Sequence, residues 1–310
     1  MTTRANDKKV FREQMEEEKD KPRKKGASAD GAKWGLLLTP QFGKSNRIDT
    51  FLENGFESEL KGLALGVDYL VTDQLVIGTV LGHVRDKAVL LNAAGSLETQ
   101  NSSLLFYTTW MPSDSVAFDA YAGIGKTQLK TQRQVIAGSI NGATTAETPG
   151  QQLLAGLSAS YQKDFGGINI SPFIAVDGIK TKFDAYDETG ATTLEFHYDK
   201  RETESFTSSL GARVGTTHSL NWGTLMPYLR LAAVHEYKND SAQIKNELVI
   251  APGSGFLVAT DEPDRNYFNV GAGAALALDH GHQVFVNYEK RVQDELLSSW
   301  AVSVGVLINF

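Results

Sequence analysis

The C-terminal stretch Trp300–Phe310 is the feature that most constrains the fold. Its even positions are Trp, Val, Val, Val, Ile and Phe, and its odd positions include Ala, Ser, Gly and Asn, with Leu307 as the bulky exception. A period of two predicts a β-strand with one apolar face and one small or polar face. About 11 residues suffice for a tilted strand to cross a bilayer. A soluble protein more often blunts such a strand with charge or proline. The remaining chain must therefore supply the other strands of a closed membrane barrel.

The same alternation recurs from Trp34 onward in twelve segments. They centre on residues 34–44, 63–69, 75–82, 104–110, 116–125, 153–161, 173–177, 209–215, 228–231, 268–278, 284–289 and 300–310. A further apolar stretch at 248–250 is assigned to a loop or to an extension of the ninth strand. The sequence predicts an all-β protein, a single 12-stranded antiparallel up-and-down transmembrane β-barrel over residues 34–310.

The connections between these segments alternate in length. We expect short turns near residues 73, 113, 166, 221 and 280 and longer connections near 50, 91, 140, 193 and 250, with a short one near 294. Short turns at one end and long loops at the other are typical of an outer-membrane barrel. A soluble β-sandwich, the alternative fold, has no reason to alternate in this way.

Composition excludes several classes of function. The 310 residues contain no cysteine, so thiolate metal sites and a thiol nucleophile are excluded. Residues 1–25 hold nine Lys/Arg and six Asp/Glu, which leaves the rest of this chain of net charge −7 with a charge of −10. An acidic body argues against nucleic acid as a partner, because phosphate binding needs clustered basic side chains. No run of 18 apolar residues predicts a transmembrane helix.

The charged N-terminal segment, residues 1–33, differs from the rest of the chain. It is either a solvated linker or a short helix that lies in the barrel lumen, with Pro22 and the following Lys and Gly residues ending the helix. It has no apolar core of a secretory signal peptide. Three explanations are open: a longer precursor, a truncated gene, or a fold other than a membrane barrel.

Polar residues on the face opposite the apolar stripe predict a hydrated lumen. We expect them to form a hydrogen-bonded wall in which opposite charges pair across the lumen and hold a threaded segment. The predicted set is Asp68, Asp119, Asp177, Arg213, Arg230, Glu236 and Glu289. Many glycines share this face and contribute no packing, which indicates a lumen that stays open or holds another segment. The lumen of a twelve-stranded barrel is intermediate in width between that of an eight-stranded barrel, which side chains fill, and that of a sixteen-stranded barrel, which is a water channel.

Catalytic and metal-binding patterns are weak. The stretch 120–127 ends in Gly-Lys-Thr, but a phosphate-binding loop must lead from a strand into a helix, and this one lies within an alternating strand. His280 and His282 have no third ligand nearby. His235 and Glu236 are neighbours on a strand, so they point to opposite faces, and His83 with Asp86 is an equally weak candidate. We predict no enzyme, no metal and no cofactor.

Several ordered patches carry a resemblance to a known family. They are Gly66–Tyr69, Thr207–Gly211, Pro227–Arg230, His235–Tyr237, Pro263–Phe268 and the terminal strand. From about Trp34 to Phe310 the chain resembles the autotransporter β-domain family. The resemblance implies a twelve-stranded translocator in the Gram-negative outer membrane, monomeric, with a helix in its pore and a passenger polypeptide on its N-terminal side. Without an Asn-Asn dipeptide, the self-cleavage of one branch of that family is not indicated.

The resemblance also implies partners. They are outer-membrane lipid, the chain's own passenger or pore segment, and the barrel-assembly machinery, which reads the last strand. The corresponding residues here are Trp300, Val302, Val304, Val306, Ile308 and Phe310. The predicted function is export and anchoring of an N-terminal passenger; the alternative is a passenger-less pore or the remnant of a truncated gene.

Overall fold

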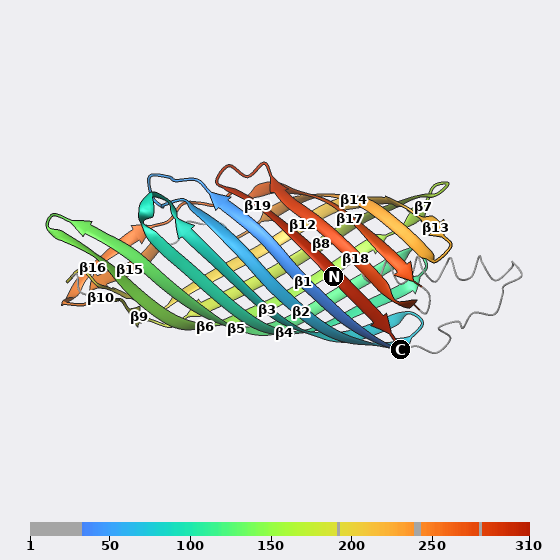
Figure 1. The fold of residues 1–310 in the computed structure, drawn as a ribbon, viewed down its shortest axis with the longest axis horizontal. Coiled ribbons are helices and arrows are strands. Elements are labelled where there is room, and N and C mark those ends of the chain that lie inside the picture. The colour runs from blue at the N-terminus through green and yellow to red at the C-terminus, as the bar shows by residue number, and fades with distance from the viewer. Residues whose placement is uncertain (1–32, 191–192, 239–242, 279–280) are drawn as a thin grey trace, which may run out of the picture.

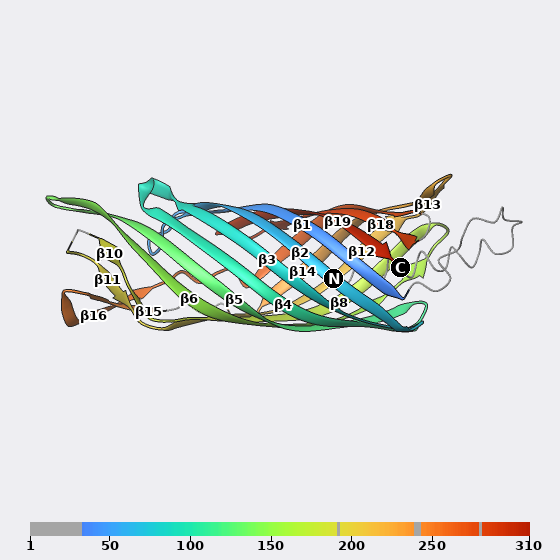
Figure 2. The ribbon, with the colours of Figure 1, turned by 60° about the horizontal axis from the view of Figure 1, so that its bottom comes forward.

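Twelve long antiparallel strands form a closed barrel in the part of the chain that is described, residues 33–190, 193–238, 243–278 and 281–310 of a computed structural model. In ring order they are β1 (Trp34–Arg47), β2 (Phe56–Thr72), β3 (Leu75–Leu90), β4 (Gly95–Ser113), β5 (Val116–Ala137), β6 (Ile140–Tyr161), β8 (Ile168–Phe183), β12 (Arg201–Thr216), β14 (Gly223–Glu236), β17 (Asn266–Leu278), β18 (Gln283–Val292) and β19 (Leu297–Asn309). Each pairs with its neighbour along the chain, which confirms the predicted fold (Figures 1 and 2). The pore helix predicted for residues 1–33 lies, except for Lys33, outside the described residues.

The barrel closes between its first and last strands. β1 pairs with β19 from Gly35 opposite Asn309 to Arg47 opposite Leu297. The N–H groups of Trp34 and Phe310 donate hydrogen bonds to each other's carbonyl oxygens, both at 3.0 Å. Closure leaves no long strand of the ring with a free edge, as the hydrocarbon interior of a bilayer requires.

The outer surface is apolar, as the alternation predicts. On β19, Val304, Val306 and Ile308 are exposed on the outside, whereas Leu307 is only 1% exposed and Gly305 is buried. The same exposed, large apolar side chains occupy alternate positions of the other strands, for example Leu63 and Leu65 on β2. A belt of this kind is stable only where lipid covers it. The described residues include no helix that is both long and apolar enough to span a membrane.

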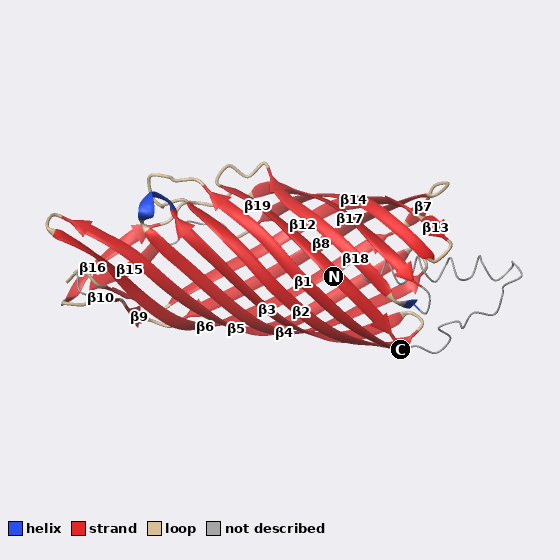
Figure 3. Cartoon of the chain, viewed as in Figure 1, coloured by secondary structure: helices blue, strands red, loops and turns tan. Residues whose placement is uncertain are grey.

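The two ends of the barrel differ. The turn end carries the two-to-four-residue turns after β2, β4 and β17 and also the ends of β1 and β19, at the right of Figure 1. The opposite, loop end carries connections 48–55, 184–200 and 237–265. The longer connections predicted near residues 91 and 140 are wrong, because β3–β6 continue as paired strands almost to their hairpin tips (Figure 3). Large apolar side chains alternate only along the part of a strand that lipid covers. The strand continues beyond that part because its backbone hydrogen bonds do not require apolar side chains.

A small second sheet covers part of the loop end. We call it the crown; its four strands, in order, are β16 (Ala251–Ala259), β15 (Gln243–Leu248), β11 (Phe196–Tyr198) and β9 (Tyr186–Asp187). Residue 248 belongs to this sheet and not to the barrel, so the 248–250 stretch lies in a connection, one of the two predicted placements. The Tyr186 and Tyr198 rings of this sheet stack on each other, with ring centroids 4.7 Å apart. Arg133 of β5 ties the crown to the barrel, since it lies 4.2 Å from the Phe196 ring centroid and forms an ion pair with buried Glu188.

Candidate functional site: the lumen wall

Tyrosines bridge alternate strands on the lumen wall by reaching across glycines. Tyr107 on β4 donates a hydrogen bond of 2.8 Å to Asp68 on β2, and Gly78 lies on the intervening strand β3. A Cβ atom at Gly78 would lie 2.5 Å from the Tyr107 ring. Only a residue without a side chain leaves room for the ring to lie flat against the backbone at this point.

Tyr121, the cross-strand partner of Tyr107, repeats the arrangement on the next strands of the wall. Its hydroxyl donates a hydrogen bond of 2.7 Å to Asp177. Tyr121 is on β5 and Asp177 is on β8, and Gly156 of β6 pairs with both. The ring occupies the space that a side chain at residue 156 would take. Three strands are thereby linked by one side-chain contact.

Two further bridges lie on β14, β17 and β18. Tyr228 donates a hydrogen bond to Asn287 over Gly273, which pairs with both residues. Arg230 donates a hydrogen bond of 2.5 Å to the carboxylate of Glu289 over Gly271. The four bridges thus share one geometry. A tyrosine or arginine side chain reaches over a glycine of the neighbouring strand and contacts a polar side chain on the strand beyond it.

These contacts correct two predictions about the lumen. Opposite charges do not pair across the lumen in the case of Arg230 and Glu289, because the two residues are only two strands apart on one wall. The glycines at 78, 156 and 273 also do not keep the lumen open, since aromatic rings fill the space above them. The physical reason is the pleat: paired residues share a face, so a large side chain on one strand covers the small residue on the next.

The other predicted lumen residues take separate roles. Asp119 accepts hydrogen bonds from Thr109 (2.7 Å) and Ser158 (3.0 Å). Glu236, at the end of β14, accepts from the Ser205 hydroxyl at 2.5 Å and from the backbone N–H of Phe206 at 2.8 Å. Glu236 therefore stabilises a strand end at the loop end of the barrel.

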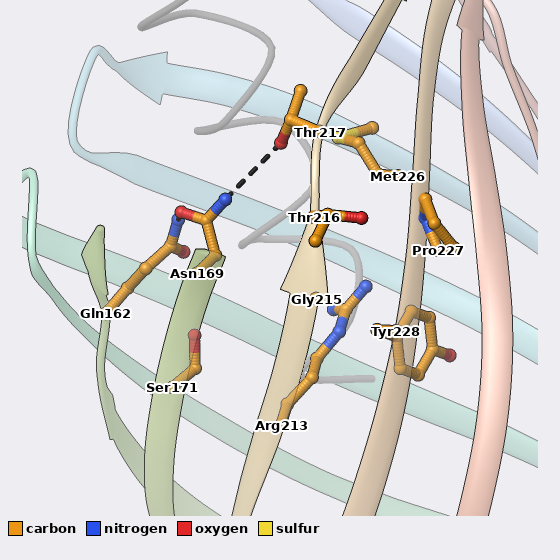
Figure 4. A pocket seen from close by; sticks show the side chains of 10 residues that line it. All are labelled: Gln162, Asn169, Ser171, Arg213, Gly215, Thr216, Thr217, Met226, Pro227 and Tyr228. Atoms are coloured by element: carbon orange, nitrogen blue, oxygen red, sulfur yellow. Dashed lines mark hydrogen bonds between the residues drawn. The ribbon is translucent and has the colours of Figure 1, made fainter. Parts of the chain in front are cut away.

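Arg213 lies nearer the turn end, where its guanidinium carbon is 3.6 Å from the centroid of the Tyr228 ring. In Figure 4 both side chains border a small cavity of about 30 Å³, with the Asn169–Thr217 hydrogen bond of 3.3 Å on its other side. A cavity of this size has room for about one water molecule. The cationic and aromatic groups here support each other, since a guanidinium over a ring face is attracted by the ring quadrupole.

A larger hollow lies in the lumen between these groups. It has a volume of about 400 Å³, and Asp119, Tyr121, Asp177, Ser209 and Arg230 are among the residues that line it. Its carboxylate, hydroxyl and guanidinium groups can solvate a polar backbone or charged side chains, and apolar side chains such as Leu105 and Phe173 line the rest. The arrangement suits a hydrated passage.

Sequence analysis missed the tyrosines as the partners of the predicted acids. Asp68 and Asp177 were expected to pair with opposite charges, and each accepts a hydrogen bond from a phenol. The signal was present: an inward tyrosine on a strand whose neighbour carries an inward glycine. It could be recognised only with the strand register, which a single sequence does not supply.

The structure also places most of the weaker candidate residues. Residues 120–127 lie wholly within strand β5 and lead into no helix. His83 and His235 contact neutral partners, Ser102 at 2.9 Å and Asn266 at 2.8 Å. His280 lies outside the described residues. Among the residues that are described, no group of three His, Asp or Glu side chains could hold a metal ion.

A closed antiparallel barrel with an apolar outer belt and a polar lumen is the architecture of a Gram-negative outer-membrane protein. The chain is such a protein. The family model described as "Autotransporter beta-domain" matches residues 38–289, and the chain belongs to that family.

Individual proteins show the same likeness. The chain is 24% identical over 300 residues to outer membrane protein A of Rickettsia conorii, with 90% of this chain but only 14% of that protein covered. The translocator domain of the autotransporter NalP from Neisseria meningitidis superposes with a TM-score of 0.72 at 13% identity, with 91% of each chain covered. The β-domain of the Bordetella autotransporter BrkA gives a TM-score of 0.65 at 16% identity, with 89% of this chain and 99% of that one covered. At these identities the two structures support the fold alone.

Proposed function

We propose that this outer-membrane translocator barrel exports and anchors a polypeptide joined to its N-terminal side, and that the polypeptide passes through the lumen. The position of the barrel's first residue is the observation that carries the proposal. Trp34 is hydrogen-bonded to Phe310 at the turn end. Short turns face the periplasm in outer-membrane barrels. A polypeptide that precedes Trp34 and reaches the cell surface must therefore traverse the barrel.

The lumen wall supports passage of a polypeptide. Hydrogen bonds and one ion pair hold the wall in place, and the hollow of about 400 Å³ presents carboxylate, hydroxyl and guanidinium groups beside apolar side chains. A chain in transit carries unpaired backbone N–H and C=O groups, which need water or polar partners. An apolar lumen would oppose its passage.

Residues 1–33 are proposed to be the part of the exported chain that stays in the lumen. Their composition supports this: nine Lys/Arg and six Asp/Glu among the first 25 residues give an excess of positive charge. The named lumen residues are in excess acidic, with the carboxylates of Asp68, Asp119, Asp177, Glu236 and Glu289 against the guanidinium groups of Arg213 and Arg230. The role requires no catalytic chemistry and no cofactor. The last strand, with Trp300, Val302, Val304, Val306, Ile308 and Phe310, is proposed as the contact for the barrel-assembly machinery, and the barrel as a monomer.

A surface-exposure experiment tests export. A signal peptide and a small protease-sensitive reporter are fused ahead of residue 1, and intact cells are treated with protease. The proposal expects cleavage of the reporter and survival of a folded barrel. The matched control carries the same signal peptide and reporter ahead of a barrel whose β19 has been removed, and its reporter should stay protected. A reporter that remains protected behind a correctly assembled wild-type barrel contradicts export.

Conductance distinguishes a translocator from a passenger-less pore. Removing residues 1–33 from the purified barrel should raise single-channel conductance if this segment fills the lumen. A pore without cargo should conduct equally with and without those residues. The folded state of both proteins is checked by circular dichroism, so that a collapsed barrel is not mistaken for a blocked one.

A further inference from the structure

A groove on the outer wall lies where the apolar belt ends, towards the loop end. Its volume is about 820 Å³, and it extends over β3, β4, β5, β6 and β8. The leucine, isoleucine and lysine side chains that border it face away from the lumen, so a polypeptide in transit does not reach them. No residue proposed for export or for assembly lines it.

The strand register arranges this groove in two adjoining rows. The lower row, which is the one nearer the turn end, is apolar. It consists of Leu81, Leu104, Ile124 and Leu153, which are cross-strand partners on successive strands. It ends at Lys180, the partner of Leu153 on β8. Leu81, Ile124 and Leu153 are more than half exposed, and Leu104 is partly buried. This row continues the belt that acyl chains cover.

The upper row is polar and lies one pleat closer to the loop end. His83, Ser102, Lys126, Gln151 and Lys182 follow one another as cross-strand partners. From this row Lys126 and Lys182 border the groove together with Ser102 and Gln151, and Lys180 borders it at the end of the apolar row. Apolar side chains below and cationic side chains above match the two halves of an anionic lipid.

The three lysines differ in their ion pairs. Lys180 forms an ion pair with Glu204 at 2.6 Å and Lys182 with Glu202 at 3.1 Å. Within the described part of the chain, no acidic side chain lies within ion-pair distance of Lys126, which stands between Ser102 and Gln151 in the row. Its charge is available to a ligand, and the paired lysines hold the far end of the groove in place.

We propose that this groove binds the head of a phosphorylated glycolipid in the outer leaflet of the membrane. The loop end faces outwards because the short turns face the periplasm, so the polar row lies at the level of the outer leaflet's heads. Lysine is a common binder of phosphate, and Ser102 and Gln151 supply the neutral donors and acceptors that sugar hydroxyls need. A free anion would have no use for the apolar row beneath.

Native mass spectrometry of the complete chain in detergent tests the site. The probes are bisphosphorylated lipid A, the same lipid after enzymatic removal of its phosphates, and inorganic phosphate. The bisphosphorylated lipid should bind, the dephosphorylated lipid should bind much more weakly, and inorganic phosphate should not displace the lipid. Equal binding of the two lipids, or displacement by inorganic phosphate, overturns the proposal.

Two matched triple variants locate the binding. One replaces Lys126, Lys180 and Lys182 by Gln; the control replaces Lys44, Lys61 and Lys290, which also follow the apolar belt but lie on β1, β2 and β18. Each lysine near a membrane surface contributes roughly fivefold to binding, and two of the three are already paired, so we expect about tenfold weaker lipid A binding in the first variant only. An equal loss in both shows general charge attraction and overturns the groove as a site.

Single substitutions at Lys126 test the site even if the triple variant does not fold. Lys126→Gln alone should weaken lipid A binding, and Lys126→Arg should retain it, because arginine keeps the charge and the donors. Circular dichroism and the heat-dependent shift in gel mobility report on the folded barrel. Unchanged binding in a folded Lys126→Gln protein contradicts the assignment.

Discussion

Tyr107 and Asp68 join two strands that are not neighbours, and their hydrogen bond of 2.8 Å passes above Gly78 of the strand between them. A barrel wall is otherwise held by backbone ladders that link adjacent strands only. A side-chain bond across an intervening strand opposes sliding of either ladder by one pair, because a slip of one residue moves each side chain to the other face. The lumen bridges therefore specify register as well as stability.

Tyr107→Phe should destabilise the barrel. Asp68 is only 1% exposed, and the substitution takes the phenol donor from this buried carboxylate while it leaves the ring in place. We expect a loss of about 1–3 kcal/mol in the free energy of unfolding, measured by denaturant titration in detergent. Tyr161→Phe is the control, since that side chain lies on the outer surface and is 47% exposed. Equal effects of the two substitutions would contradict a special role for the bridge.

Gly156→Ala should push Tyr121 away from Asp177. The new methyl group would occupy the place of the ring and approach Asp177 Oδ1 to 2.7 Å. Overpacking of this kind costs about 1–3 kcal/mol. Thermal unfolding followed by gel mobility measures the change. Gly178→Ala on β8 is the matched control, because its nearest contact would be an ordinary 3.6 Å. A Gly156→Ala barrel as stable as that control would show that the ring does not need the glycine.

Val304→Arg should impair insertion into the membrane. Val304 lies on the outer face of β19 and is 40% exposed where lipid would cover it. A charged side chain on the lipid face near the midplane costs about 2–4 kcal/mol. The adjacent Ser303 faces the lumen, where Asn287 donates to its hydroxyl at 3.4 Å, so Ser303→Arg should be tolerated better. The assembled fraction in membranes measures both. The assignment of Val304 to the lipid-facing side of β19 is wrong if Val304→Arg assembles as well as Ser303→Arg.

The crown should be more stable at mildly acidic pH than at alkaline pH. The hydrogen bond with Asp187 raises the pKa of His197, and the charges of Asp187, Asp199 and Glu247 add to the increase while desolvation opposes it. A raised pKa in the folded state means that the charged imidazole stabilises the crown below its unfolded pKa of about 6.5. That contribution is lost as the pH rises through the folded value.

Hydrogen exchange measures this dependence. Amides of β11 and β15 should be better protected in the wild type than in His197→Gln at pH 6, and the difference should vanish at high pH. Amides of the barrel strand β3 serve as the internal control, since they are remote from the crown. A difference between the proteins that does not change with pH would contradict the titration of His197.

Strand facing could be read from the sequence, because the alternation of large apolar and small or polar residues depends only on the pleat of each strand. The outward positions of Val304, Val306 and Ile308 and the closure of β19 on β1 agree with it. The extent of β5 and β6 was not predicted. Beyond the lipid belt, Lys126 and Lys130 replace apolar residues on the outer face, so the pattern ends while the paired backbone continues.

The sequence by itself determined the class of fold, the number of strands and the face on which each side chain lies, since all three follow from a period of two. The tertiary structure decided which residues meet. Asp177 faces Tyr121 over Gly156, and Lys126 lies between Ser102 and Gln151, only because the strands pair in one register. The register is set by closure of the whole ring and by the packing of rings over glycines, and neither is a property of any single strand.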